Sequence, residues 1–259
     1  MLGALLRGPP AFQAATPWSA GASLVAGAAM FLAANFLGWL LALAYVEILH
    51  AGGGEVSPGP IPGGAGRNAG ITIVWLFGTQ IALTLLVLVV AGLFGATART
   101  TLALRRPAQG WTVYPRALVG ILALVGVFNA LAWIAGVTDL LQDLRPFLQL
   151  MQSDAWPVLM LAIAIGAPAS EELLFRGFLL PALAASPLGF RGAALVTTVM
   201  WTALHAGYSV LGVIEVFLIG LFFCWLFWRT GSLWVPIVCH AIYNTILLVV
   251  MFVLLPIPT

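Results

Sequence analysis

Residues 210–228 read VLGVIEVFLIGLFFCWLFW, and Glu215 is the only charged side chain among them. An apolar run of roughly 18 residues or more is long enough to cross a lipid bilayer as an α-helix. Several such runs follow one another along the 259 residues, of which 62% are hydrophobic and only 7% are charged. Soluble domains carry about a quarter charged residues. The sequence therefore predicts an all-α, polytopic bundle of transmembrane helices.

The apolar runs divide the chain into about seven expected membrane spans. They cover residues 21–48, 71–96, 117–137, 155–184, 193–208, 210–228 and 233–255. The expected number ranges from about six to about eight, because the run 155–184 contains Pro168 and would give two spans if it divided there. The connection 51–68 is rich in glycine and proline, and we expect no regular structure in it.

The distribution of arginine predicts which side of the membrane each connection faces. Arg99, Arg105, Arg106 and Arg116 lie in or beside the connection between the second and third spans. Because arginine-rich connections stay in the cytoplasm, we place this one there. Alternation along the chain then puts the N-terminal segment, which carries Arg7, in the cytoplasm as well, and seven spans put the C-terminus outside.

Ionisable side chains inside the apolar runs need a reason, because each costs roughly 2.5–3.5 kcal/mol at the centre of a bilayer. The first three spans contain few carboxylate or amide side chains, namely Asn35, Glu47, Gln80 and Asn129. The last four spans hold most of the polar residues, namely Glu171, Glu172, Arg176, His205, Glu215, His240 and Asn244. We interpret Glu47 and Glu215 as residues near span ends, and we expect a polar cavity within the last four spans.

The stretch SEELLFRG, residues 170–177, assigns different roles to its two glutamates. Glu172 and Arg176 are four residues apart, so they share a helix face and can neutralise each other. Glu171 points about 100° away from that face and has no partner in its own helix. It is therefore the candidate for chemistry. Pro168 just before it predicts a kink or a new helix start, where the helix dipole would favour a carboxylate.

Two later spans supply further polar residues. His205 closes the otherwise apolar run 193–208, while His240 and Asn244 are four residues apart and share a helix face in the last span. A single intramembrane histidine is often only a hydrogen-bonding residue between helices. A free glutamate, two histidines and an asparagine on three spans exceed what packing requires, so Glu171, His205, His240 and Asn244 form the predicted site.

The polar residues of the last four spans form three motifs along the chain, and these motifs resemble those of a known family. The motifs are Glu171-Glu172-x-x-x-Arg176, Trp201-x-x-x-His205 and His240-x-x-x-Asn244. They are similar to those of the CPBP family, which comprises CAAX prenyl protease type 2 and the Abi-like intramembrane endopeptidases associated with bacteriocin processing. The resemblance covers about residues 156–255. We therefore divide the chain into N-terminal helices without a motif, residues 1–150, and a protease core, residues 151–259.

One position departs from the family's pattern. The second motif usually begins with phenylalanine, and here it begins with Trp201. Because an aromatic ring remains, we expect its packing to be kept.

The resemblance implies an all-helical core around a polar cavity and a role for each motif residue. Glu171 and His205 would hold the attacking water, and His240 and Asn244 would face the developing oxyanion. These residue types suit peptide hydrolysis, which needs a base for the water and hydrogen-bond donors for the tetrahedral oxygen.

The supporting residues and the cofactor follow from the same resemblance. Glu172 and Arg176 would support the site. The family is described both as glutamate-dependent and as a metalloprotease. A zinc ion, if present, would be held by Glu171, His205 and His240, leaving an open position for water. The chain has no HExxH motif, and we expect no obligatory metal or other cofactor.

The expected function is that of an intramembrane endopeptidase, either for CAAX-type processing or for processing of bacteriocins and other peptides. Its partners would be the lipid bilayer and a membrane-associated peptide or protein substrate, in a prokaryotic plasma membrane. The net charge of +2 gives no indication of nucleic-acid binding. The alternative is a non-enzymatic immunity or scaffold protein of the same fold. A transporter is less favoured, because the sequence shows no inverted repeat.

Overall fold

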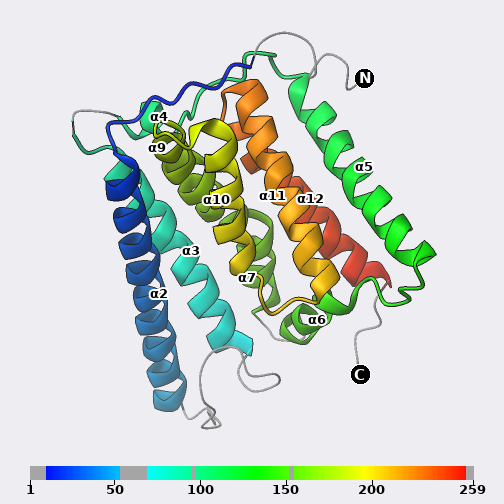
Figure 1. Ribbon diagram of the computed structural model, residues 1–259. Helices are drawn as coiled ribbons and strands as arrows, with labels where there is room; N and C mark the ends of the chain where they lie inside the picture. Colours follow the sequence, from blue (N-terminus) through cyan, green and yellow to red (C-terminus); the bar gives the residue numbers. More distant parts are fainter. Residues whose placement is uncertain (1–9, 53–68, 95–96, 152–154, 255–259) are drawn as a thin grey trace.

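The computed structural model describes residues 10–52, 69–94, 97–151 and 155–254. Within these ranges all regular structure is helical, which confirms the predicted all-α bundle (Figure 1). The long helices are α2 (Ala20–Ala51), α3 (Ala69–Ala91), α5 (Val113–Ile134), α11 (Val210–Thr230) and α12 (Trp234–Leu254). Shorter elements are α4 (Ala98–Thr101), η1 (Gln142–Leu144), α6 (Arg145–Met151) and α10 (Gly189–Ala203). Arg7 and most of the connection 51–68 lie outside the described residues.

One further helix runs without interruption over Trp156–Ala184. It consists of α7 (Trp156–Leu161), η2 (Ala162–Gly166), α8 (Ala167–Glu171), η3 (Glu172–Leu179) and α9 (Leu180–Ala184), and both η2 and η3 are π-helical. Nearly half of its most apolar window is buried, against 22% for the windows of α2 and α5. This helix therefore forms the centre of the bundle.

Long helices that follow one another along the chain run in opposite directions, except that the Trp156–Ala184 helix and α11 run the same way, because α10 returns the chain between them (Figure 1). Within the described residues, six helices are long and apolar enough to cross a membrane. The expected span 193–208 is the exception, because its helix α10 has only 15 residues and ends at Ala203. At 1.5 Å per residue such a helix is shorter than the bilayer's apolar core of about 30 Å. His205 consequently lies in the turn that follows α10.

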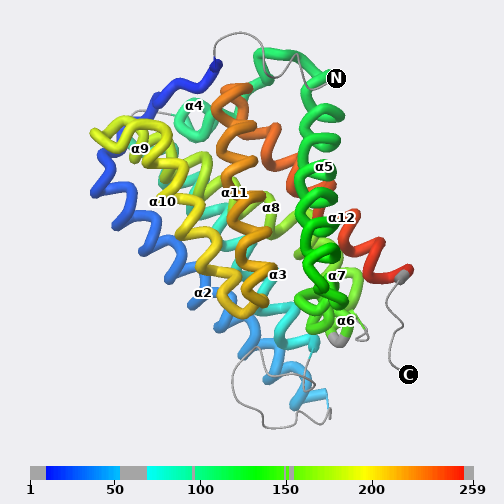
Figure 2. Tube along the Cα trace, turned by 45° about the vertical axis from the view of Figure 1, so that its right-hand side comes forward, coloured from blue at the N-terminus to red at the C-terminus, as the bar shows by residue number. Residues whose placement is uncertain are grey.

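The interior contact between α2 and α3 depends on small side chains. A Cβ atom on Gly38 would lie 2.1 Å from the Thr79 hydroxyl, and one on Gly78 would lie 2.8 Å from a Leu41 methyl group. Only glycine permits this approach, as is common where membrane helices pack. The α2–α3 pair then lies against the Trp156–Ala184 helix and covers one side of it (Figure 2).

The arginines gather at one end of the bundle, as the sequence predicts. This end contains α4, the first turns of α5 and α10, and the last turn of α11. Its arginines are Arg99, Arg105, Arg106, Arg116, Arg191 and Arg229. The opposite end contains η1 and α6 with Asp139, Asp143 and Arg145. Charge is therefore strongly asymmetric between the two ends.

Two prolines change the hydrogen-bond register of the central helix. The Ala167 N–H donates five residues back, to the Ala162 carbonyl, and the next residue is Pro168. The Leu180 N–H likewise donates to the Phe175 carbonyl, and Pro181 follows. Proline has no N–H to donate to a carbonyl in the preceding turn. The backbone hydrogen bonds before each proline can therefore change from the α pattern, four residues back, to the π pattern, five residues back. The predicted helix start at Pro168 is therefore wrong, and Glu171 lies within a continuous helix.

Candidate active site

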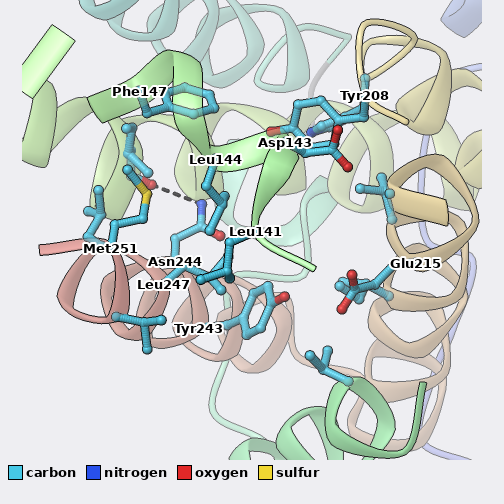
Figure 3. Close-up of a pocket in the computed structure, with 18 of the residues that line it drawn as sticks. Leu141, Asp143, Leu144, Phe147, Tyr208, Glu215, Tyr243, Asn244, Leu247 and Met251 are labelled. Atoms are coloured by element: carbon cyan, nitrogen blue, oxygen red, sulfur yellow. Dashed lines mark hydrogen bonds between the residues drawn. The ribbon is translucent and has the colours of Figure 1, made fainter. Parts of the chain in front are cut away.

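A cavity of about 850 Å³ opens in the interior of the bundle (Figure 3). Residues of α3 and α5 line it together with the later helices, so it extends beyond the last four expected spans. Its walls come from α3, α5, the segment 138–147, the central helix, the turn after α10, α11 and α12. All four residues of the predicted site line it, namely Glu171, His205, His240 and Asn244. The structure therefore brings side chains from three separate sequence motifs to one cavity.

Beside the cavity, Glu172 and Arg176 form the predicted ion pair. Both side chains are completely buried, and Arg176 Nη1 lies 3.0 Å from Glu172 Oε1. The same carboxylate oxygen lies 3.1 Å from His240 Nδ1. Arg176 Nη2 donates to the Gly220 carbonyl at 3.2 Å, and its guanidinium carbon lies 4.5 Å from the centre of the Trp201 ring. Glu172 is thus the shared anion of a buried network.

Glu171 faces the cavity and lies in a different environment. Its side chain is half-buried, and it forms no ion pair within the described part of the chain. Its Oε2 accepts a hydrogen bond of 2.5 Å from Trp201 Nε1. A hydrogen bond to a carboxylate is among the stronger ones in proteins. The carboxylate is therefore held on one side and open to the cavity on the other.

Trp201 has a larger role than the packing we expected from the sequence. Its ring packs edge-on against His205 and His240, with ring centres 5.1 and 5.7 Å apart. It also covers Arg176 and donates to Glu171. The signal for this role was the replacement of phenylalanine by tryptophan in the second motif, because only the indole supplies an N–H donor.

The partners of the two histidines decide which ring nitrogen carries hydrogen. His205 Nδ1 lies 3.2 Å from the Trp201 carbonyl oxygen, and His240 Nδ1 faces the Glu172 carboxylate. Both partner atoms only accept hydrogen bonds, so we assign the hydrogen to Nδ1 in each case. The Nε2 atom of each histidine is then left for water or substrate.

Asn244 is oriented by the π-helical segment η2. In that register the partner of the Ile163 carbonyl would be the N–H of Pro168, which does not exist. Asn244 Nδ2 fills this position and donates to the Ile163 carbonyl at 2.9 Å (dashed line, Figure 3). The amide keeps a second N–H for another acceptor. Pro168 therefore acts on the site indirectly, through the carbonyl that it leaves without a partner.

The opposite wall of the cavity contains a polar pair that the sequence interpretation missed. Asn129 Nδ2 on α5 donates to Glu215 Oε1 on α11 at 2.9 Å. Both side chains line the cavity, and Figure 3 shows Glu215 across from Asn244. Glu215, which we interpreted as a span-end residue, lies in the second turn of α11 and also lines the cavity. The sequence feature that could have indicated this pair is Asn129, an isolated amide in an otherwise apolar run.

One edge of the cavity is fixed by Asp143, close to Tyr208 (Figure 3). Asp143 accepts hydrogen bonds of 2.7 Å from both the backbone N–H and the hydroxyl of Ser209, the N-cap of α11. Burial, together with the negative charges of Glu171 and Asp143, raises the pKa of Tyr208 to about 12. Tyr208 therefore stays a neutral hydroxyl at physiological pH.

The zinc alternative does not fit this geometry. It requires Glu171, His205 and His240 to converge on one ion. Across the described residues, no group of three or more histidine, cysteine, aspartate or glutamate side chains lies close enough to hold a metal ion. We therefore derive no step through a metal, and independence from metals stays a prediction.

The geometry defines the class of this protein first. It is an integral membrane protein of helices, with an internal cavity whose lining includes Glu171, two histidines and Asn244. The family described as type II CAAX prenyl endopeptidase Rce1-like matches residues 153–246. This part of the chain is similar to that family, which confirms the resemblance found in the motifs. No curated protein and no solved structure matches the chain.

Proposed function

We propose that this protein is an intramembrane endopeptidase in which Glu171 and His205 activate the water that hydrolyses a peptide bond. The observation that supports it best is the shared cavity, which both residues line together with His240 and Asn244. The family match supports an endopeptidase of the CAAX type in general.

Glu171 is the base in this proposal. Trp201 Nε1 holds one of its carboxylate oxygens, so the other is free to accept a proton from a water molecule in the cavity. His205 holds the same water through Nε2, because its Nδ1 is occupied by the Trp201 carbonyl. The hydroxide equivalent attacks the peptide carbonyl, and the proton passes to the leaving amine.

His240 and Asn244 stabilise the tetrahedral oxygen. Asn244 offers the N–H that remains after its bond to the Ile163 carbonyl. His240 donates through Nε2 when protonated, while Glu172 accepts from Nδ1 in either protonation state. Losing one donor of this kind typically costs a factor of about 10²–10³ in rate.

The substrate we propose is a peptide or protein held in the membrane, processed either as a CAAX-type C-terminus or as a bacteriocin-like precursor. The cavity lies among helices whose outer faces are apolar, so a membrane-bound segment is the chain that can reach it. We further propose a prokaryotic plasma membrane, with the arginine-rich end and the N-terminus in the cytoplasm. A phosphatase fused after the last helix should then be active, and an inactive fusion would contradict this orientation.

The test is cleavage by the purified protein in detergent against prenylated and unprenylated peptides. Wild type should cleave at least one peptide, and Glu171→Ala should not, while its thermal unfolding stays close to that of wild type. Glu47→Gln is the matched control, since Glu47 is an exposed carboxylate near the end of α2. Equal cleavage by wild type and Glu171→Ala would overturn the mechanism, and no cleavage at all would favour the non-enzymatic alternative.

A strong chelator added to the same assay tests the metal. We expect cleavage to continue in its presence. Loss of cleavage that zinc restores would make the protein a metalloprotease and would assign His205 and His240 as ligands.

A further inference from the structure

A second cavity of about 350 Å³ lies at the arginine-rich end of the bundle. It shares no lining residue with the candidate active site. It opens between the connection from α4 to α5 and the first turns of α12. Its lining consists of three arginines, three aromatic residues and three apolar ones, namely Arg99, Arg105, Arg106, Trp111, Tyr114, Trp234, Leu104, Pro107 and Val238.

The walls of this cavity are fixed by hydrogen bonds between two connections that are far apart in sequence. The Leu233 N–H donates to the Ala103 carbonyl at 3.1 Å, and the Ala108 N–H donates to the Thr230 carbonyl at 3.3 Å. The Ser232 hydroxyl donates to the Arg105 carbonyl at 2.5 Å. The cavity is therefore built by the fold and does not depend on a flexible surface loop.

Two of the three guanidinium groups are held in place by backbone carbonyls. Arg105 Nε donates to the Gly231 carbonyl at 2.7 Å, and Arg99 Nε donates to the Leu104 carbonyl at 3.2 Å. Arg106 is exposed, and no hydrogen bond or ion pair joins it to the described residues. Since a carbonyl does not neutralise a cation, the positive charges of the cavity remain available to an anion.

No acidic residue in the described part of the chain compensates these charges at this end. The acidic residues that the structure describes are Glu47, Asp139, Asp143, Glu171, Glu172 and Glu215. Glu47 is near the far end of α2, Asp139 and Asp143 are at the opposite end, and the others lie along the central helix and the first turns of α11. The cavity therefore carries a net positive charge that none of the acidic residues the structure describes balances.

The aromatic residues indicate where the cavity lies relative to the bilayer. Trp111 is 72% exposed and Trp234 is 44% exposed, and both border the arginines. Exposed tryptophan and tyrosine are typical of the boundary between lipid headgroups and acyl chains. Leu104 and Val238 add an apolar surface beside the cations. An anionic group with attached acyl chains fits both the cationic and the apolar side chains of this lining.

We propose that this cavity binds the headgroup of an anionic phospholipid, with the phosphate on Arg99, Arg105 and Arg106. Basic pockets at the cytoplasmic side of membrane helices are suited to such headgroups, and each arginine near the surface contributes about 1 kcal/mol, or roughly fivefold in affinity. This inference does not depend on the proposed protease function.

The test is lipid binding to the full chain, measured by native mass spectrometry with phosphatidylglycerol and phosphatidylcholine of the same acyl composition. Wild type should prefer phosphatidylglycerol, and Arg99→Gln/Arg106→Gln should lose roughly 25-fold of that preference. Arg105 is left intact, because its hydrogen bond to the Gly231 carbonyl joins the two connections that form the cavity walls, whereas that of Arg99 is local. Arg191→Gln is the matched control, since Arg191 is exposed at the same end and does not line the cavity.

Each outcome decides the inference. Loss of the preference in the double variant, with Arg191→Gln unchanged, supports the site. Equal losses per substituted arginine in the two variants would show a diffuse charge effect and overturn it. Complete competition by an excess of inorganic phosphate would overturn the lipid assignment and identify free phosphate as the ligand.

Discussion

Glu171 and Glu172 are neighbours in the chain, yet they belong to two different regions of the molecule. Glu172 is completely buried, and its Oε1 accepts hydrogen bonds from Arg176 and His240. Glu171 is half-buried in the wall of the cavity, where Trp201 holds only one of its oxygens. The environment of Glu172, with Arg176 and His240, is closed, and we call it the closed region. The environment of Glu171 at the cavity is open, and we call it the open region.

The difference comes from the rotation of about 100° between successive residues of a helix. That rotation sends one carboxylate into the contact with α11 and α12 and the other into the cavity. A buried carboxylate without its partners would be strongly destabilising, whereas a carboxylate at a cavity can exchange protons with water. The closed region should therefore control stability, and the open region should control activity.

The largest expected effect is the loss of peptide cleavage when Glu171, the glutamate of the open region, is replaced. Glu171→Gln keeps the size of the side chain but removes the base, so peptide cleavage should fall by a factor of about 10²–10⁴. Glu215→Gln is the matched control, because Glu215 is the carboxylate on the opposite wall, and we expect it to lose less than about tenfold. Steady-state cleavage rates of both variants make the comparison. A similar loss in both would mean that the two carboxylates are equally required, against the distinct role assigned to Glu171.

The next largest expected effect is the loss of folding stability when the ion pair of the closed region is broken. Removing the cationic partner of the buried pair, as in Arg176→Met, should lower the free energy of unfolding by about 3–5 kcal/mol, since Glu172 is left as a buried charge with only the hydrogen bond from His240. Unfolding midpoints in detergent measure this.

Two variants control this experiment. Arg145→Met removes the partner of Asp139 from a pair whose side chains are 65% and 43% exposed, and it should cost less than about 1 kcal/mol. The double variant Glu172→Leu/Arg176→Met should recover much of the lost stability, because no lone charge remains. A double variant as unstable as the sum of its two single variants would contradict the lone-charge explanation.

Trp201 connects the two regions, and a conservative change can test that connection. Trp201→Phe keeps a ring over Arg176 but removes the N–H bound to Glu171, as the family's usual phenylalanine would. A hydrogen bond to a charged group contributes about 1.5–3 kcal/mol to stability, so the variant should lose up to that amount, and kcat should fall roughly ten- to a hundredfold because Glu171 is no longer held in place. Trp225→Phe, which alters a ring stacked on Phe222 outside the cavity, should leave kcat unchanged. Equal kcat values for wild type and Trp201→Phe would remove Trp201 from the site.

Much of the fold was predictable because lipid imposes simple rules. Long apolar runs gave the positions of the helices, and the pairing of Glu172 with Arg176 followed from their four-residue spacing. The short helix α10 was not predictable, because a run of apolar residues does not show where a helix gives way to a turn. His205 lies in that turn, at the end of a run that we expected to be helical throughout.

The candidate site was predictable only as a set of side chains. The motifs selected four residues that line one cavity, but they gave no partner for Glu171 or Asn244. Those partners are Trp201 on α10 and the Ile163 carbonyl in η2, and both depend on how helices distant in sequence pack. The pair of Asn129 and Glu215 was missed for the same reason, because 86 residues separate them.

The smallest expected effect tests the proline that frees the Ile163 carbonyl. Pro168→Ala supplies an N–H in the position that Asn244 Nδ2 now serves, so Asn244 should be held less firmly in the open region. One neutral hydrogen bond is worth about 0.5–1.5 kcal/mol, and we expect cleavage to fall roughly two- to tenfold.

Pro157→Ala is the control for this variant, because Pro157 lies in the first turn of α7, where a proline costs little. The decisive measurement is a double-mutant cycle with Asn244→Ala. If Pro168 acts through Asn244, its replacement should have no further effect on cleavage once that amide is gone. A loss that persists undiminished in the Asn244→Ala background would show that Pro168 acts on the helix itself, and the open region would then owe its geometry to Trp201 alone.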